Sequence, residues 1–159
     1  MKISLRLFAL TLALLAVVTF PLHAQPITKT TLGLELAKKI AAKAEAAAAD
    51  KKWTVVVALV DDGGNLVLLQ RMDGTQLASI EVAMAKAKTA LRFKRPTKVF
   101  EDAVAGGRNA ILSLPDALLV EGGVPLTVNG AIIGAIGISG MTAAQDGEVA
   151  AAALTALTP

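Results

Sequence analysis

The chain has 159 residues, which suits one domain, and 54% of them are apolar, so a folded core is expected. Its 16 Lys and Arg against 13 Asp and Glu give a net charge of only +3, which offers little support for nucleic-acid binding. Cysteine and tyrosine are absent and His23 is the one histidine. Disulfides, thiol nucleophiles, thiolate metal sites and most imidazole chemistry are therefore excluded.

The first 24 residues have the three parts of a secretory signal peptide. Residues 1–6 are basic, residues 7–20 form an apolar run, and a proline and a small residue, Ala24, follow. The apolar run reaches only about 21 Å as a helix, short of the roughly 30 Å hydrocarbon core, so stable membrane insertion is not expected. We predict cleavage after Ala24, export to the periplasm or the extracellular space, and a mature domain of residues 25–159 without histidine.

The first half of the mature chain predicts a helix and a β-hairpin. Apolar residues recur every three or four positions from Leu32 onward, and Thr30 and Thr31 are candidate caps for a helix that ends near Asp50. Residues 53–60 form a β-branched run that is too continuous for a one-sided strand, which predicts a central strand buried on both faces. Turn residues at 61–65 and apolar residues at 66–69 complete the hairpin.

The middle of the chain predicts two helices. Residues 75–93 have helical periodicity, and Pro96 ends this helix because the residue before a proline avoids the α region. The expected buried stripe consists of Leu77, Ile80, Met84, Ala87 and Leu91. Thr97 is a candidate cap for a short helix that extends through Ala105, and residues 111–120 are expected to contain a turn and a short strand.

The last third predicts a second hairpin and a final helix. Residues 124–128 and 131–139 flank Asn129-Gly130, the dipeptide that a type I′ turn favours. Thr142 and Gln145 match a capping box that opens the last helix. Because short turns join successive strands, we predict an α+β domain with a mainly antiparallel sheet covered by helices.

A series of short motifs occurs in the same order as in a known family. The motifs are Val60-Asp61 with Gly63-Gly64, Arg71-Met72-Asp73-Gly74 followed by Ser79, Lys86-Ala87-Lys88-Thr89-Ala90, Arg95-Pro96-Thr97, Gly122-Gly123-Val124-Pro125, Asn129-Gly130 leading to Gly134-Ala135-Ile136-Gly137-Ile138-Ser139-Gly140, and Gln145-Asp146. With them the chain resembles the GlcG/HbpS haem-binding family, whose domains are similar to the C-terminal domain of PduO. The resemblance implies a profilin-like or roadblock-like fold, usually oligomeric, with some exported members that bind haem.

Haem needs an apolar slot and cations or amides for its two propionates. Arg92, Arg95 and Lys98 lie at and after the end of the predicted long helix and are candidate propionate partners. The same cations also suit the solvated C-terminal end of a helix, where the helix dipole favours positive charge. Both interpretations stay open at the level of the sequence.

Haem usually also needs a side chain that donates to iron, and the mature chain offers no His, Cys or Tyr for this purpose. Met72 and Met141 are the candidate iron ligands, with Met72 preferred, while Met84 is assigned to the core. Lys86 and Lys88 are interpreted as exposed helical lysines. We therefore expect loose haem binding through apolar and propionate contacts. A haem held at a subunit interface, or ligated by another molecule, is the alternative.

Other candidate sites are weaker. Ser79 and Lys86 lie seven residues apart on the predicted helix and are interpreted as ordinary exposed side chains, not as a nucleophile and its base. The spacing of Gly134, Gly137 and Gly140 is interpreted as close packing of a strand, not as a phosphate loop. Asp61, Asp62 and Asp73 are interpreted as turn-capping residues, not as a calcium or magnesium site.

Two functions from different classes remain open. The first is an exported haem or tetrapyrrole binding protein without catalysis, which acts as a carrier, scavenger or sensor input. The second is an oligomeric assembly or small-acid binding domain without haem. An enzyme is the least favoured class, since the mature chain has no histidine for acid–base work. Alanine-rich first and last helices allow close helix approach, so we predict a homo-oligomer in either case.

Overall fold

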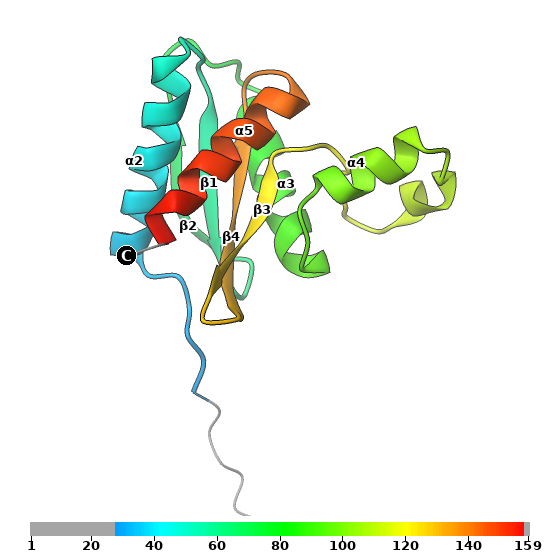
Figure 1. Cartoon of the computed structure of the whole chain (residues 1–159), viewed down its shortest axis with the longest axis horizontal. Coiled ribbons are helices and arrows are strands. Elements are labelled where there is room, and N and C mark those ends of the chain that lie inside the picture. The colour runs from blue at the N-terminus through cyan, green and yellow to red at the C-terminus, as the bar shows by residue number, and fades with distance from the viewer. Residues whose placement is uncertain (1–27, 158–159) are drawn as a thin grey trace, which may run out of the picture.

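The computed structural model describes residues 28–157, so the predicted signal peptide lies outside the described residues. A four-stranded antiparallel sheet in the order β2-β1-β4-β3 forms the centre of the domain, with helices packed on it (Figure 1). The strands are β1 (Val56–Asp61), β2 (Leu66–Arg71), β3 (Gly123–Val128) and β4 (Ala131–Ser139). The predicted α+β class and antiparallel sheet are confirmed.

Helices cover both faces of this sheet. The α-helices are α2 (Leu34–Asp50), α3 (Ser79–Phe93), α4 (Lys98–Ala105) and α5 (Ala143–Ala153), and the 3₁₀ helices are η2 (Asn109–Ser113) and η3 (Leu154–Leu157). Val57 and Leu59 of β1 point into the larger core with α2 and α5, whereas Val56 and Ala58 point toward α3. This alternation buries β1 on both faces, as its continuous apolar run predicted.

Two glycines allow α3 to lie directly on the sheet. A Cβ at Gly137 of β4 would overlap the carbonyl oxygen of Ala83, and a Cβ at Gly123 of β3 would lie 2.8 Å from the carbonyl carbon of Lys86. Backbone therefore packs against backbone at this interface, which confirms the interpretation of the strand glycines. This close packing fixes the orientation of α3, and with it the direction of the side chains on the exposed face of the helix.

The buried face of α3 differs from the predicted stripe. The helix begins at Ser79 and not at Thr75, so Leu77 precedes it and is 74% exposed. Ile80, Met84 and Leu91 are only half-buried. The buried residues of α3 are Ser79, Ala83, Lys86, Ala87, Thr89 and Ala90. Ala87 is buried as predicted, but the large apolar residues of the stripe are not, because a helix packed on glycine backbone buries its small residues and leaves the large apolar ones at the flanks.

Caps are predicted for three helices; those of two are wrong, and that of the third is confirmed. Thr31 lies before Gly33, the residue that precedes α2, and its hydroxyl donates to Asp62. Thr97 precedes α4, but its Oγ1 accepts a hydrogen bond of 2.9 Å from the Gly123 amide instead. The capping box of Thr142 and Gln145 is present in both directions at the start of α5.

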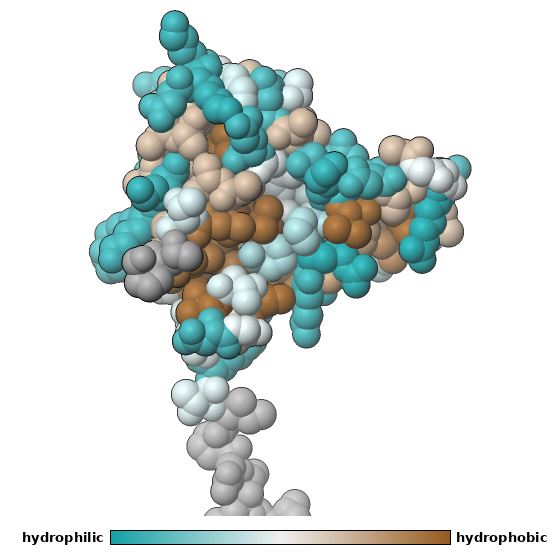
Figure 2. All heavy atoms as spheres, viewed as in Figure 1, coloured by the Kyte–Doolittle hydropathy of each residue, from teal (hydrophilic) through white to brown (hydrophobic). Residues whose placement is uncertain are grey.

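An arm, defined here as residues 95–121, projects from the sheet and contains α4 and η2 (Figure 1). The strand predicted within residues 111–120 is absent from it, because Pro115 and the left-handed Asp116, at φ 51°, form a turn there. Apolar side chains are exposed on the arm (Figure 2). They include Val99, Leu112 and Val120.

Candidate functional site

The groove between α3 and the arm, here called the arm groove, is the first part of the candidate site. It has a volume of about 410 Å³ and is lined by Ala85, Lys88, Arg92, Leu114, Asp116, Ala117 and Leu118. The Leu118 amide donates a 2.9 Å hydrogen bond to the hydroxyl of buried Thr89, which ties the wall of the groove to α3. The groove thus has an apolar wall on the arm and two cations on the helix.

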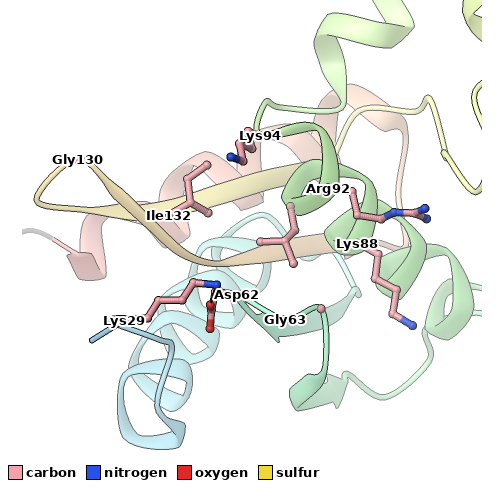
Figure 3. Close-up of a pocket in the computed structure, with 10 residues that line it drawn as sticks. Lys29, Asp62, Gly63, Lys88, Arg92, Lys94, Gly130 and Ile132 are labelled. Carbon is pink, nitrogen blue, oxygen red and sulfur yellow. Dashed lines mark ion pairs between the residues drawn. The ribbon is translucent and has the colours of Figure 1, made fainter. Parts of the chain in front are cut away.

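A second hollow, here called the turn pocket, lies beside the C-terminal end of α3. It has a volume of about 750 Å³ and is lined by Lys29, Asp62, Gly63, Gly64, Lys88, Leu91, Arg92, Lys94, Gly130 and Ile132 (Figure 3). Lys88 and Arg92 line both hollows. In Figure 3 these two side chains extend from α3 in the same direction, away from Lys29 and Asp62. They form a ridge of positive charge between the two hollows.

Positive charge predominates at this site. The ammonium groups of Lys88 and Lys94 have no ion-pair partner within residues 28–157. Lys29 pairs with Asp62, and the hydrogen bond from Lys29 lowers the pKa of Asp62, with Thr31 adding to the effect. A site with unpaired cations beside an apolar wall is suited to a ligand that has an apolar body and carboxylate groups.

One of the three predicted propionate partners lies in this site. Arg92 lines both hollows, as described above. The Nε of Arg95 donates to the Phe93 carbonyl at 3.1 Å, and its guanidinium lies over the Phe100 ring at 5.8 Å. Lys98 pairs with Asp102 at 2.8 Å. Arg95 and Lys98 therefore have partners at the base of the arm and line neither hollow.

The two methionines predicted as iron ligands lie elsewhere. Met72 lines a separate hollow beside α2, with Ala42, Ala46 and Asp73 among its neighbours. Met141 is 37% exposed just before α5 and lines neither the arm groove nor the turn pocket. Within residues 28–157, no group of three or more His, Cys, Asp or Glu side chains could hold a metal ion.

Sequence reasoning missed a buried ion pair between α3 and α5. Lys86 and Asp146 are 1% and 2% exposed, and Lys86 Nζ donates to Asp146 Oδ2 at 2.7 Å and to the Ile138 carbonyl at 3.0 Å. Asp146 Oδ1 accepts from the Met141 amide at 3.0 Å. Burial raises the pKa of Asp146, and the hydrogen bond and charge of Lys86 oppose this effect.

This pair corrects the interpretation of Lys86 as an exposed lysine. Ser79, which shared that interpretation, is also fully buried and accepts a 3.3 Å hydrogen bond from Ser139. The available signal was the position of Lys86 three residues after Ala83 and four before Ala90, which places it on the small-residue face of the helix. Asp61, in contrast, caps its own turn as predicted, because its Oδ1 accepts from the Gly63 and Asn65 amides.

The antiparallel sheet, the arm and the basic groove define a small α+β domain that is suited to binding an acidic small ligand. Residues 32–155 match a family model described as haem degrading protein HbpS-like, and the chain belongs to this HbpS-like family. This result confirms the family that the motifs indicated. No helix within the described part of the chain has the length and apolarity that a membrane crossing requires.

Several known proteins are similar to the chain. Protein GlcG of Escherichia coli (strain K12) is 42% identical over 112 residues, which are 70% of this chain and 84% of GlcG. The crystal structure of HbpS has 33% identity and a TM-score of 0.77, and the match covers 85% of this chain and 96% of that one. The structure of a PduOC:haem complex has 30% identity and a TM-score of 0.73, with coverage of 81% and 96%.

Proposed function

We propose that this chain is an exported haem-binding protein without catalytic activity, which acts as a carrier, scavenger or sensor input. The observation that carries the proposal is the cationic ridge of Lys88 and Arg92 beside the apolar wall of the arm groove. A relative solved as a PduOC:haem complex supports the choice of ligand. Haem has a broad apolar face and two carboxylates, which match the wall and the ridge.

The residues of the site fit two of the three requirements of haem. Leu114 and Leu118 offer an apolar surface that excludes water from the face of a porphyrin. Arg92 can hold a carboxylate through two parallel hydrogen bonds, and Lys88 offers a point charge one helical turn away. The carboxylates would thus be held on α3, whose position is fixed by its close packing on the sheet.

The third requirement, an iron ligand, is not met by the walls of the site. His, Cys and Tyr are absent from the described residues, and Met72 and Met141 line neither hollow. We therefore propose that binding rests on apolar and carboxylate contacts, so haem would bind loosely and exchange readily. Loose binding suits transfer or sensing better than a permanent cofactor.

Replacing Arg92 with alanine is expected to weaken haemin binding about two- to fivefold, because an ion pair that is exposed to water contributes at most about 1 kcal/mol. An absorbance titration in the Soret region measures the affinity. Arg71→Ala is the matched control, since it removes the same charge from an exposed strand end that lines neither hollow. Equal weakening by both variants would indicate a general charge effect, and the absence of any Soret shift in the wild type would overturn the haem proposal.

A domain that binds a small acid without haem is the second candidate. The turn pocket favours it, because Lys88, Arg92 and Lys94 line that pocket together and none of its lining residues is a usual iron ligand. Protein that stays colourless through purification and with added haemin would favour this candidate over the first. Pigment retained through purification would favour haem.

We also propose that the chain is exported and forms a homo-oligomer. The amino-terminal sequence pattern supports export, and the exposed Val99, Leu112 and Val120 on the arm support association. Mass spectrometry of the protein from the extracytoplasmic fraction is expected to give a denatured mass for residues 25–159 and a native mass that is a multiple of it. A mass that includes the first 24 residues would contradict export, and a native monomer would contradict association.

A further inference from the structure

The arm groove contains a carboxylate of its own. Arg92 Nη1 lies 3.3 Å from Asp116 Oδ2 and 3.5 Å from the Asp116 carbonyl oxygen, and both residues line the groove. The Asp116 side chain is 79% exposed, and Arg92 is its one ion-pair partner within residues 28–157. The cation that suits a ligand carboxylate is therefore already paired with a carboxylate of the protein.

The backbone at Asp116 has a left-handed conformation, which few residues other than glycine, asparagine and aspartate adopt. Its φ of 51° is left-handed, and it follows Leu114, at φ −64° and ψ 125°, and Pro115. Proline followed by a residue with positive φ is the pattern of a type II turn, whose second central position favours glycine or asparagine. The turn itself does not require a carboxylate at this position. Aspartate at this position places its carboxylate next to the guanidinium of Arg92.

We propose that Asp116 is a latch carboxylate, which occupies Arg92 when the groove is empty and is displaced by a carboxylate of the ligand. This inference rests on the proposed function. The pair is longer than the 2.7–2.9 Å that is usual for a charge-assisted hydrogen bond. Because the pair is also exposed to water, an incoming carboxylate can replace Asp116 with little loss of interaction.

The latch has a consequence for specificity. A ligand with one carboxylate gains little at Arg92, because it exchanges one carboxylate for another there. A ligand with two carboxylates also reaches the ammonium group of Lys88, one helical turn away, which has no ion-pair partner among the described residues. The groove therefore selects dianionic ligands, such as a tetrapyrrole with two propionates, over monoanionic ones.

Replacing Asp116 with asparagine tests the latch, since asparagine accepts the left-handed backbone and lacks the charge. We expect haemin to bind this variant about two- to fivefold more tightly, a range set by the small contribution of exposed ion pairs. Asp50→Asn is the matched control, because it makes the same change of charge at the exposed end of α2. Citrate, measured by calorimetry, serves as a second probe that has carboxylates and no porphyrin.

Each result decides between the alternatives. Tighter binding of haemin or citrate by Asp116→Asn alone, lost again in the Arg92→Ala background, supports the latch. If Asp116→Asn binds each probe as tightly as the wild type does, or if its gain persists without Arg92, the latch is overturned. Weaker binding by Asp116→Asn also overturns it and would show that Asp116 positions Arg92 for the ligand. If the wild type binds no haemin, the proposed function fails, and the citrate titration still decides whether Asp116 competes for Arg92.

Discussion

Replacing Lys86 with methionine is expected to lower the free energy of unfolding by about 3–5 kcal/mol, because it leaves an unpaired carboxylate in the interior. Lys86 and Asp146 are each almost fully buried, and Asp146 keeps only the Met141 amide and nearby backbone as partners once the ammonium is gone. Methionine is similar in length and apolar, so little packing is lost. Urea denaturation, followed by the fluorescence of Trp53, measures the change.

The loss should depend on pH in a defined direction. Burial raises the pKa of Asp146 above its ordinary 3.8, and removing Lys86 removes the main opposing effect. Between the ordinary value and the raised one, the native state of the variant binds more protons than the unfolded state, so its stability falls as pH rises. The variant should therefore be closest to the wild type near pH 4 and furthest from it at neutral pH.

A double variant separates charge from packing. Lys86→Met with Asp146→Leu replaces the pair by apolar groups, and such replacements are often neutral or stabilising. We expect the double variant to regain most of the stability that the single variant loses, even if the single variant does not fold. A double variant as unstable as the single one would place the loss in packing, and a single variant as stable as the wild type would show that the pair contributes nothing.

The hairpins were predictable because their signals are local. Asn129 and Gly130 have φ values of 50° and 78°, the positive angles that a type I′ turn needs, and two residues suffice to specify such a turn. The β-branched run of β1 likewise reports its own burial on both faces. In these segments the neighbours along the chain determine the structure, so inspection of the sequence succeeds.

The buried face of α3 and its ion pair depend on residues far away in the sequence. Lys86 meets Asp146 across a separation of 60 residues, and it can be buried only because Gly123 and Gly137 bring the helix close to the sheet. Apolar periodicity reports which residues are large and apolar. It does not report whether the opposing surface has side chains, and here the opposing surface is backbone.

The candidate site was predictable only in the part that has a local sequence signal. Arg92 was identified because cations cluster after the long helix, and the structure places it in both hollows. The turn at Pro115 and Asp116, which completes the arm groove, has irregular backbone without periodicity. Met72 is favoured as a ligand by its thioether and by its place at a predicted strand end, and neither feature indicates that its hollow lies beside α2.

Replacing Gly137 with alanine is expected to destabilise the protein by about 3 kcal/mol, the upper part of the range for overpacking. The added Cβ would overlap the Ala83 carbonyl oxygen and lie 2.6 Å from the Ala87 amide nitrogen. Both atoms belong to the backbone of α3, so a side-chain rotation cannot relieve the overlap. The helix would have to move off the sheet, and it would then disturb the Lys86 pair as well as the ridge of Lys88 and Arg92.

Gly33→Ala is the matched control for this prediction. No atom lies within 4 Å of a Cβ at Gly33, and its φ of −87° is ordinary for any residue, so only the weaker helix capping of alanine is expected to act and the stability should fall by no more than about 1 kcal/mol. Urea denaturation compares the two variants, and a haemin titration of folded Gly137→Ala reports whether the ridge has moved. Equal stability of the two variants would mean that α3 can move away from the sheet at little cost in free energy. The inference that close packing fixes the position of Lys88 and Arg92 would then be wrong.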